Sequence, residues 1–256
     1  MVIPMYPLIR NHNGDEDSIQ QRQAGALEYL VFPKLEETGV VRHLFTTRTG
    51  GASKGVCATM NLSFSRGDDP EAVMENYRRI GEVLGVAPDH MAASRQTHTT
   101  NIHLVTETDL GNGITRPSAY EEIDGLATDQ PGIALVTYYA DCVPLYFVDP
   151  VHHAIGLAHS GWRGTVSRMG EHMVQFMQEQ FQSRPEDLVA AIGPSICVDC
   201  YEVSEEVAEQ FRGDFPENVL KKGKMPGKYQ LDLWEANRSI LLKAGILPEH
   251  LAVTDI

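Results

Sequence analysis

The segment YYADCVPLYF, from Tyr138 to Phe147, places an aspartate and a cysteine side by side in an otherwise apolar run. A run of this composition predicts a strand. A carboxylate buried in such a strand costs several kcal/mol unless it is paired or bound to something. We therefore expect Asp141 and Cys142 to belong to a functional site. The histidine of GLAHSGWRG, His159, follows 17 residues after Cys142 and must be considered with them.

Strand-like and helical patterns alternate around this segment. The clearest helix is predicted over residues 70–84, because Asp69 can cap it, Pro70 suits its first position and Gly85 can end it. A helix is also predicted in LDLWEANRSILLKAG, and another after GWRG, where apolar residues recur at helical spacing: Val166, Met169, Met173 and Phe176. Strands are predicted in EYLVFPKL, VRHLFTTRTGG, NIHLVTET, IDGLATDQPGIALVTYYADCVPLYFVDP, HHAIGLAHSGWRG and DLVAAIGPSI. This alternation, without an internal repeat or linker, favours a single α/β domain.

Charge and the N-terminal residues narrow the class of protein. The net charge of −14 and the pI of about 5.1 argue against a nucleic-acid partner, which usually requires a basic surface. Residues 1–25 are polar and irregular, and we expect a loose arm there, followed by a domain over 26–256. No signal peptide is recognisable, and the longest apolar stretch, 132–148, is too short to cross a bilayer. These features predict a cytoplasmic protein that does not bind membranes.

The four cysteines, Cys57, Cys142, Cys197 and Cys200, are too few for a disulfide scaffold in 256 residues. Cys197 and Cys200 form a single C-x-x-C without the second pair that a zinc ribbon requires. Two thiols in a loop is the simpler interpretation of that motif.

Three residues at strand ends or in turns could bind a metal ion: His98, Cys142 and His159. Thiolate and imidazole are preferred zinc ligands, and three protein ligands leave one position open for water or substrate. Scattered residues with such spacing are more often structural, so the context carries the argument. Asp141 could orient a ligand or act as a base, and Arg48 and Arg163, beside glycine turns, could bind an anion. A surface salt bridge is the alternative for either arginine.

Several motifs occur in an order that resembles a known family: TTRTGGAS, MNLSF, GDDPEAVMENYRRI, RQTH, DGLATDQPGIALVTYYADCVPLYFVDP, AHSGWRG, AAIGPSICVDCYEV and LDLWEANR. Together they resemble the laccase-domain family, also called the multicopper polyphenol oxidoreductase or purine nucleoside phosphorylase family. The resemblance covers about residues 43–256. It implies a single-domain sandwich of mixed β-sheets flanked by helices, acting as a monomer or homodimer.

The resemblance also implies site residues and an activity. The family's metal ligands correspond to His98, Cys142 and His159, which would hold one zinc ion. The residues that line the family's substrate site correspond to Arg48, Asn61, Asp141 and Arg163, with Asp141 and the two arginines as the expected catalytic residues. The implied reactions are phosphorolysis of adenosine, guanosine, inosine and methylthioadenosine, and deamination of adenosine. Purine nucleosides and phosphate are the expected partners.

The chain departs from the family pattern in two places. It stops at LAVTDI, before the longer tail that the family usually has, so we expect that tail to be missing. In SICVDCYEV, two residues separate cysteines that the family more often places together.

Two other functions remain open on the sequence. One is a copper-dependent polyphenol oxidase, but a multicopper site needs about ten histidines in paired H-x-H arrangements, and the sequence has no H-x-H. The other is a non-enzymatic cell-envelope regulatory module that kept the fold.

Overall fold

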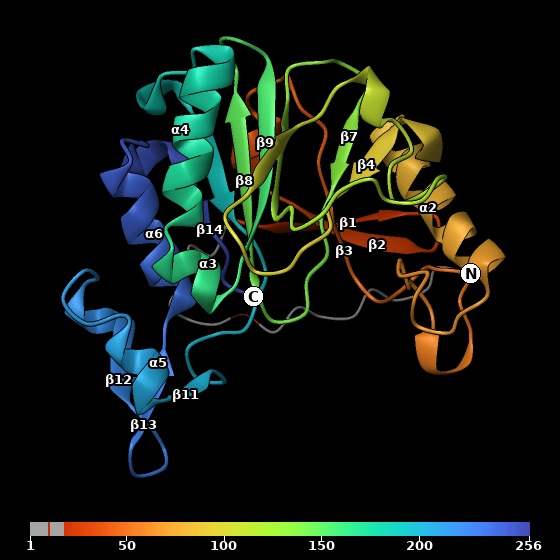
Figure 1. The fold of residues 1–256 in the computed structure, drawn as a ribbon. Coiled ribbons are helices and arrows are strands. Elements are labelled where there is room, and N and C mark those ends of the chain that lie inside the picture. Colours follow the sequence, from red (N-terminus) through yellow and green to blue (C-terminus); the bar gives the residue numbers. More distant parts are fainter. Residues whose placement is uncertain (1–9, 11–17) are drawn as a thin grey trace.

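A mixed six-stranded sheet forms the centre of the computed structural model, which describes Arg10 and residues 18–256 (Figure 1). The strand order is β14-β10-β8-β9-β6-β5. Neighbouring strands are antiparallel except for the β5–β6 and β10–β14 pairs, which are parallel. The strands are β5 (Ile102–Leu104), β6 (Gly125–Thr128), β8 (Val143–Asp149), β9 (Ala154–Ser160), β10 (Val189–Ile192) and β14 (Leu251–Val253).

One face of this sheet is covered by the helices α3 (Trp162–Val166), α4 (Met169–Phe181) and α6 (Leu233–Lys243) (Figure 1). Met169, Met173 and Met177 of α4 are fully buried in the core between helices and sheet. A Cβ on Gly156 of β9 would lie 2.9 Å from the Met173 sulfur. The helix α4 therefore packs directly on the backbone of β9 at this glycine. Among the described residues, no helix is both long and apolar enough to cross a membrane.

The helix predicted after GWRG is in fact two helices. The chain breaks at Ser167 and Arg168, and Arg168 adopts a left-handed conformation with φ of 59°. Val166 of α3 is half-buried against the same core that contains Met169 and Met173 of α4, so the helical spacing in the sequence continued across the break.

The opposite face is covered by a second, three-stranded sheet, β1 (Gln20–Ala24), β2 (Leu27–Val31) and β3 (Phe45–Thr46), with the short helix α1 (Pro33–Glu36). Alternate residues of β8 enter the two cores: Leu145 and Phe147 face the helices, whereas Tyr146 and Val148 face the second sheet. Burial of both faces explains why this segment is apolar throughout. The predicted α/β sandwich of mixed sheets flanked by helices is confirmed.

The expected loose arm over 1–25 is wrong at its end, because residues 20–24 form β1 and pair with all of β2. Ser18 and Ile19, just before β1, are buried as well. Residues 1–9 and 11–17 lie outside the described residues.

The helix predicted over 70–84 is confirmed as α2 (Pro70–Leu84). The Asp69 carboxylate accepts a hydrogen bond from the Glu71 amide at 3.0 Å, and Gly85 ends the helix with φ of 77°. The helix packs on a small parallel pair, β4 (Met91–Ala93) and β7 (Ala134–Val136).

A third sheet with helix α5 (Glu205–Glu209) extends away from the main body (Figure 1). Its strands are β11 (Glu202–Ser204), β12 (Leu220–Lys222) and β13 (Lys228–Leu231). Single 3-10 turns occur at Gly55–Cys57, Pro88–His90, Glu107–Asp109, Pro185–Asp187, Glu217–Val219 and Pro248–His250.

Candidate metal centre

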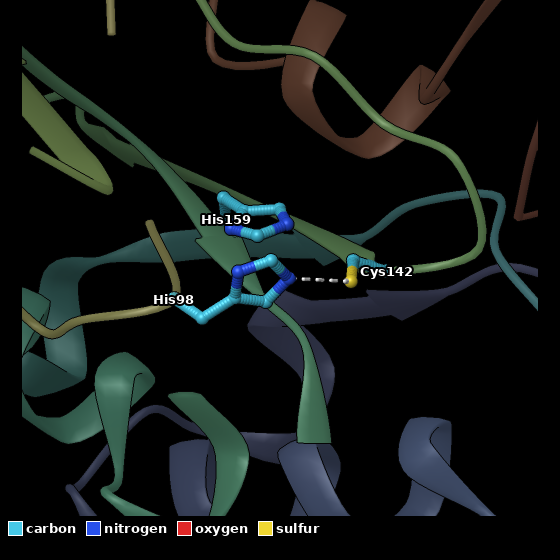
Figure 2. A group of neighbouring side chains, drawn as sticks. All are labelled: His98, Cys142 and His159. Atoms are coloured by element: carbon cyan, nitrogen blue, oxygen red, sulfur yellow. Dashed lines mark hydrogen bonds between the residues drawn. The ribbon is translucent and has the colours of Figure 1, made fainter. Parts of the chain in front are cut away.

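The structure brings His98, Cys142 and His159 together, with ligand atoms all within 4.8 Å of one another (Figure 2). The register of β8 and β9 explains two of the three positions, because Pro144 pairs with His159 and Cys142 lies just before β8. His98 comes from the loop that follows β4, and its Nε2 lies 3.9 Å from the Cys142 sulfur. Three soft or borderline donors around one point can hold a single metal ion with one position left open.

A buried carboxylate organises two of these three residues. Asp124, fully buried, accepts a 2.7 Å hydrogen bond from Nδ1 of His159, which leaves the Nε2 atom of that ring for a metal ion. Asp124 also accepts from the backbone amides of Thr97, His98 and Thr99 at 2.9–3.0 Å. It therefore holds both the His159 ring and the loop that carries His98.

The charges of this group depend on one another. Burial opposes ionisation of Asp124, but hydrogen bonds from His159 and the backbone amides outweigh it and lower the pKa of the carboxyl to about 2. Burial likewise opposes a charged His159, but its contacts with Asp124 and Cys142 raise the pKa of the imidazole to about 9. The sequence analysis missed Asp124. The sequence feature that could have revealed Asp124 is an acid beside an apolar, strand-like run, in IDGLAT. The same kind of context drew attention to Asp141.

The metal-free protein should lose stability in acid because of Asp124. A carboxyl whose pKa falls from 3.8 to about 2 on folding stabilises the fold by about 2 kcal/mol above pH 4, and this is lost as the pH falls to about 2. Urea unfolding between pH 5.5 and 2.5 measures the effect. Asp124→Asn should be less stable at pH 5.5 and should lose less over this range. An equal loss in variant and wild type would contradict the assignment.

Gly161, which directly follows β9, also shapes the site. A Cβ at this position would lie 2.7 Å from the Cys142 sulfur and 3.2 Å from Cδ2 of His98. Two side chains of the candidate metal group thus pack directly on the bare α-carbon. The φ of Gly161 is −70°, so space, not backbone conformation, requires glycine here.

A cavity of about 1740 Å³ opens beside the three residues. All three line it, as do Arg48 and Asn61. This volume exceeds the roughly 300–1,000 Å³ of typical small-molecule pockets, so it does not limit a ligand of nucleoside size. Arg48 is exposed in the cavity wall, whereas the Asn61 amide is engaged by Ser63 and Asp68 within its own loop.

The loop that carries Arg48 and Asn61 is fixed by a buried asparagine that the sequence analysis also missed. Asn76 of α2 accepts from the Ala52 amide at 2.6 Å and donates to the Asn61 carbonyl at 2.8 Å. It also donates to the Ser53 hydroxyl at 2.9 Å. The sequence feature that could have revealed Asn76 is an amide side chain among the apolar positions of an amphipathic helix.

Two predicted site residues lie elsewhere than the sequence suggested. Asp141 is exposed, not buried, because β7 ends at Val136, β8 begins at Val143, and Asp141 lies in the intervening bend with φ of 77°. The premise of a buried acid in a strand was therefore wrong. Arg163 is exposed near the start of α3, with its guanidinium 4.3 Å from the Trp162 ring centre. Neither residue is among those that line the cavity.

Comparison with known proteins now identifies the family. A family model described as "Multi-copper polyphenol oxidoreductase laccase" matches residues 42–256. The chain belongs to this laccase family. Its relatives include the "Purine nucleoside phosphorylase YlmD" of Geobacillus stearothermophilus, 41% identical over 213 residues, which are 82% of this chain and 78% of that protein. Another is the "Adenosine deaminase RL5" of an unknown prokaryotic organism, 35% identical over 223 residues, or 86% of this chain and 84% of that protein.

Solved structures agree with this membership. The crystal structure of YlmD from Geobacillus stearothermophilus superposes with a TM-score of 0.85 at 37% identity, covering 93% of this chain and 88% of that one.

The word "multi-copper" in the family's description refers to several metal ions, so the number that this laccase-family chain can hold matters. Among residues 18–256 and Arg10, no second group of three histidine, cysteine or acidic side chains converges as His98, Cys142 and His159 do. The donor set on these described residues fits one ion, with the Asp124–His159 bond fixing which ring nitrogen faces it.

Proposed function

We propose that this chain is a zinc-dependent purine nucleoside phosphorylase that also deaminates adenosine. One observation carries the proposal: His98, Cys142 and His159 converge at the wall of a cavity that also contains Arg48. Relatives named purine nucleoside phosphorylase and adenosine deaminase support the same class of substrate. The proposed functional unit is the domain expected over residues 26–256 together with β1, which pairs with β2.

We propose zinc as the ion held by these three residues. Two imidazoles and one thiolate suit zinc, and a three-residue set with an open fourth position is typical of catalytic zinc sites. Zinc bound there would act as a Lewis acid and lower the pKa of water in the open position toward neutrality, which suits deamination. The Asp124 carboxylate keeps Nε2 of His159 free to coordinate.

Phosphorolysis needs a bound phosphate and a group that protonates the departing purine. Arg48 is the proposed phosphate ligand in the cavity wall. Arg163 of α3, which does not line the cavity, is the second guanidinium proposed to bind phosphate. Asn61 would act through the shape of its loop, since its amide is already hydrogen-bonded.

Asp141 is the proposed proton donor. It lies between two residues that line the cavity, Ala140 and Cys142, and its carboxylate is exposed. An exposed acid can exchange protons with solvent between turnovers. In phosphorolysis the bond from ribose to the purine nitrogen breaks, the phosphate oxygen bonds to the ribose, and the purine gains the proton.

The test is a nucleoside reaction analysed by chromatography. With phosphate, adenosine should give adenine and ribose 1-phosphate; without phosphate, it should be converted slowly to inosine. Asp141→Asn should lower the rate by roughly 10² while leaving bound zinc unchanged. Loss of zinc in this variant would instead mean that Asp141 braces its neighbour Cys142. No product from any purine nucleoside would refute the enzyme proposal, and phenol oxidation with added copper would favour an oxidase.

A further inference from the structure

A closed network of buried side chains joins α6 to the turn that follows β9. Ser160, Thr165 and Asn237 are each fully buried. Oγ of Ser160 lies 3.0 Å from Oδ1 of Asn237, and Nδ2 of Asn237 lies 3.0 Å from Oγ1 of Thr165. The same amide nitrogen is 2.8 Å from the Leu233 carbonyl oxygen.

The arrangement of protons below gives every donor an acceptor. The Asn237 amide has two N–H bonds, which it donates to Leu233 and Thr165. The Thr165 hydroxyl then donates to the Gly161 carbonyl at 3.0 Å, and the Ser160 hydroxyl donates to Oδ1 of Asn237. The two hydroxyl oxygens lie 3.1 Å apart, which closes the ring of contacts. A flipped amide would place Oδ1 against the Leu233 carbonyl oxygen, so the orientation is fixed. Buried networks satisfied in this way are rigid.

The network ends at the glycine on which the metal ligands pack. The Gly161 carbonyl accepts both the Thr165 hydroxyl and the Thr165 amide, the latter at 2.8 Å. The α-carbon of Gly161 contacts Cys142 and His98, since a Cβ there would be 2.7 Å from the one and 3.2 Å from the other. A shift of this turn would therefore move directly into two ligand side chains.

We propose that Thr165 and Asn237 are positioning residues of the metal centre. They touch neither ligand. Instead they fix the Gly161 backbone, and through it the separation of the Cys142 sulfur from the His98 ring. This inference rests on the proposed metal site. Metal sites tolerate only about ±0.2 Å in ligand distance, so a small movement of the turn has a large effect on affinity.

Thr165→Val tests the proposal, because valine keeps the shape of threonine but lacks the hydroxyl. Its dissociation constants for Zn²⁺ and Co²⁺, measured by competition with a chelator, should rise about 10-fold. This is the lower end of the roughly 10- to 100-fold cost of losing a direct hydrogen-bond partner of a metal ligand, because Thr165 acts one step further out. The absorption band of the Co²⁺–thiolate bond should also shift. Thr165→Ser restores the hydroxyl and should return both measurements to within about threefold of the wild type.

Ser239→Ala is the matched control, since Ser239 is a buried hydroxyl on α6, the helix of Asn237, and donates to the Ala236 carbonyl at 2.8 Å. We expect it to cost about as much thermal stability as Thr165→Val and to leave metal affinity unchanged. If Thr165→Val does not fold, Ser160→Ala removes one donor of the network and should still weaken binding several-fold.

Three results would overturn the proposal. Wild-type affinity in a folded Thr165→Val, or in Ser160→Ala where the valine variant does not fold, would show that the network does not position the ligands. Equal weakening in Ser239→Ala would reduce the effect to global stability. A wild type that binds neither Zn²⁺ nor Co²⁺ would remove the metal site and the positioning role together. The first two results leave the proposed function standing, so the failures are distinguishable.

Discussion

Cys142→Ala is expected to lose most of the metal that the wild type carries, lowering affinity by 100-fold or more. Loss of an outer hydrogen-bond partner alone typically costs 10- to 100-fold, and Cys142 would contribute one of only three ligand atoms. The thiolate is also the single negative ligand of the set, so its removal leaves two neutral imidazoles. Elemental analysis of protein purified without added metal should show about one zinc per wild-type chain and little in the variant.

The other thiols provide the control for this result. Cys197→Ala and Cys200→Ala also remove a sulfur, from the C-x-x-C segment between β10 and β11, outside the group of converging ligands. Both should keep the metal of the wild type. Full metal content in Cys142→Ala would refute the ligand assignment, and loss of metal in the control variants would point to a different site.

Gly161→Ala should have the second largest effect. The added Cβ would lie 2.7 Å from the Cys142 sulfur, whereas non-bonded heavy atoms prefer roughly 3.5–4.0 Å. The sulfur must therefore move by about 1 Å, several times the tolerance of a metal–ligand distance. We expect metal affinity to fall by roughly 100-fold and the metal-free fold to lose about 1–3 kcal/mol from overpacking.

Gly164, three residues further on in HSGWRG, is the matched control. Its nearest neighbours would lie 3.5 Å or more from an added Cβ, which is ordinary contact, and it lies within α3. Gly164→Ala should bind metal normally and gain up to about 1 kcal/mol of stability, because alanine favours a helix more than glycine does. Chelator competition and urea unfolding measure both quantities. Equal metal affinity in the two variants would contradict the packing of the ligands on Gly161.

Features that depend on neighbouring residues could be predicted from the sequence. The helix α2 followed from its cap at Asp69, its proline and its terminating glycine, all of which act within one turn. The buried strand β8 followed from its apolar run. The grouping of His98, Cys142 and His159 is not local, and it was expected from their chemistry and the family resemblance. The break between α3 and α4 escaped prediction, because the helical spacing of apolar residues continues through it.

The sequence by itself determined the types of side chain available and the local elements that carry them, because caps, turns and periodicity act over a few residues. Only the tertiary structure decided that Asp141 is exposed and that Asp124 is the buried acid of the site. Asp124 bonds to residues 26 and 35 positions away in the chain. Such contacts arise from the register of β6, β8 and β9, and a shift of one residue in that register would turn each side chain to the opposite face.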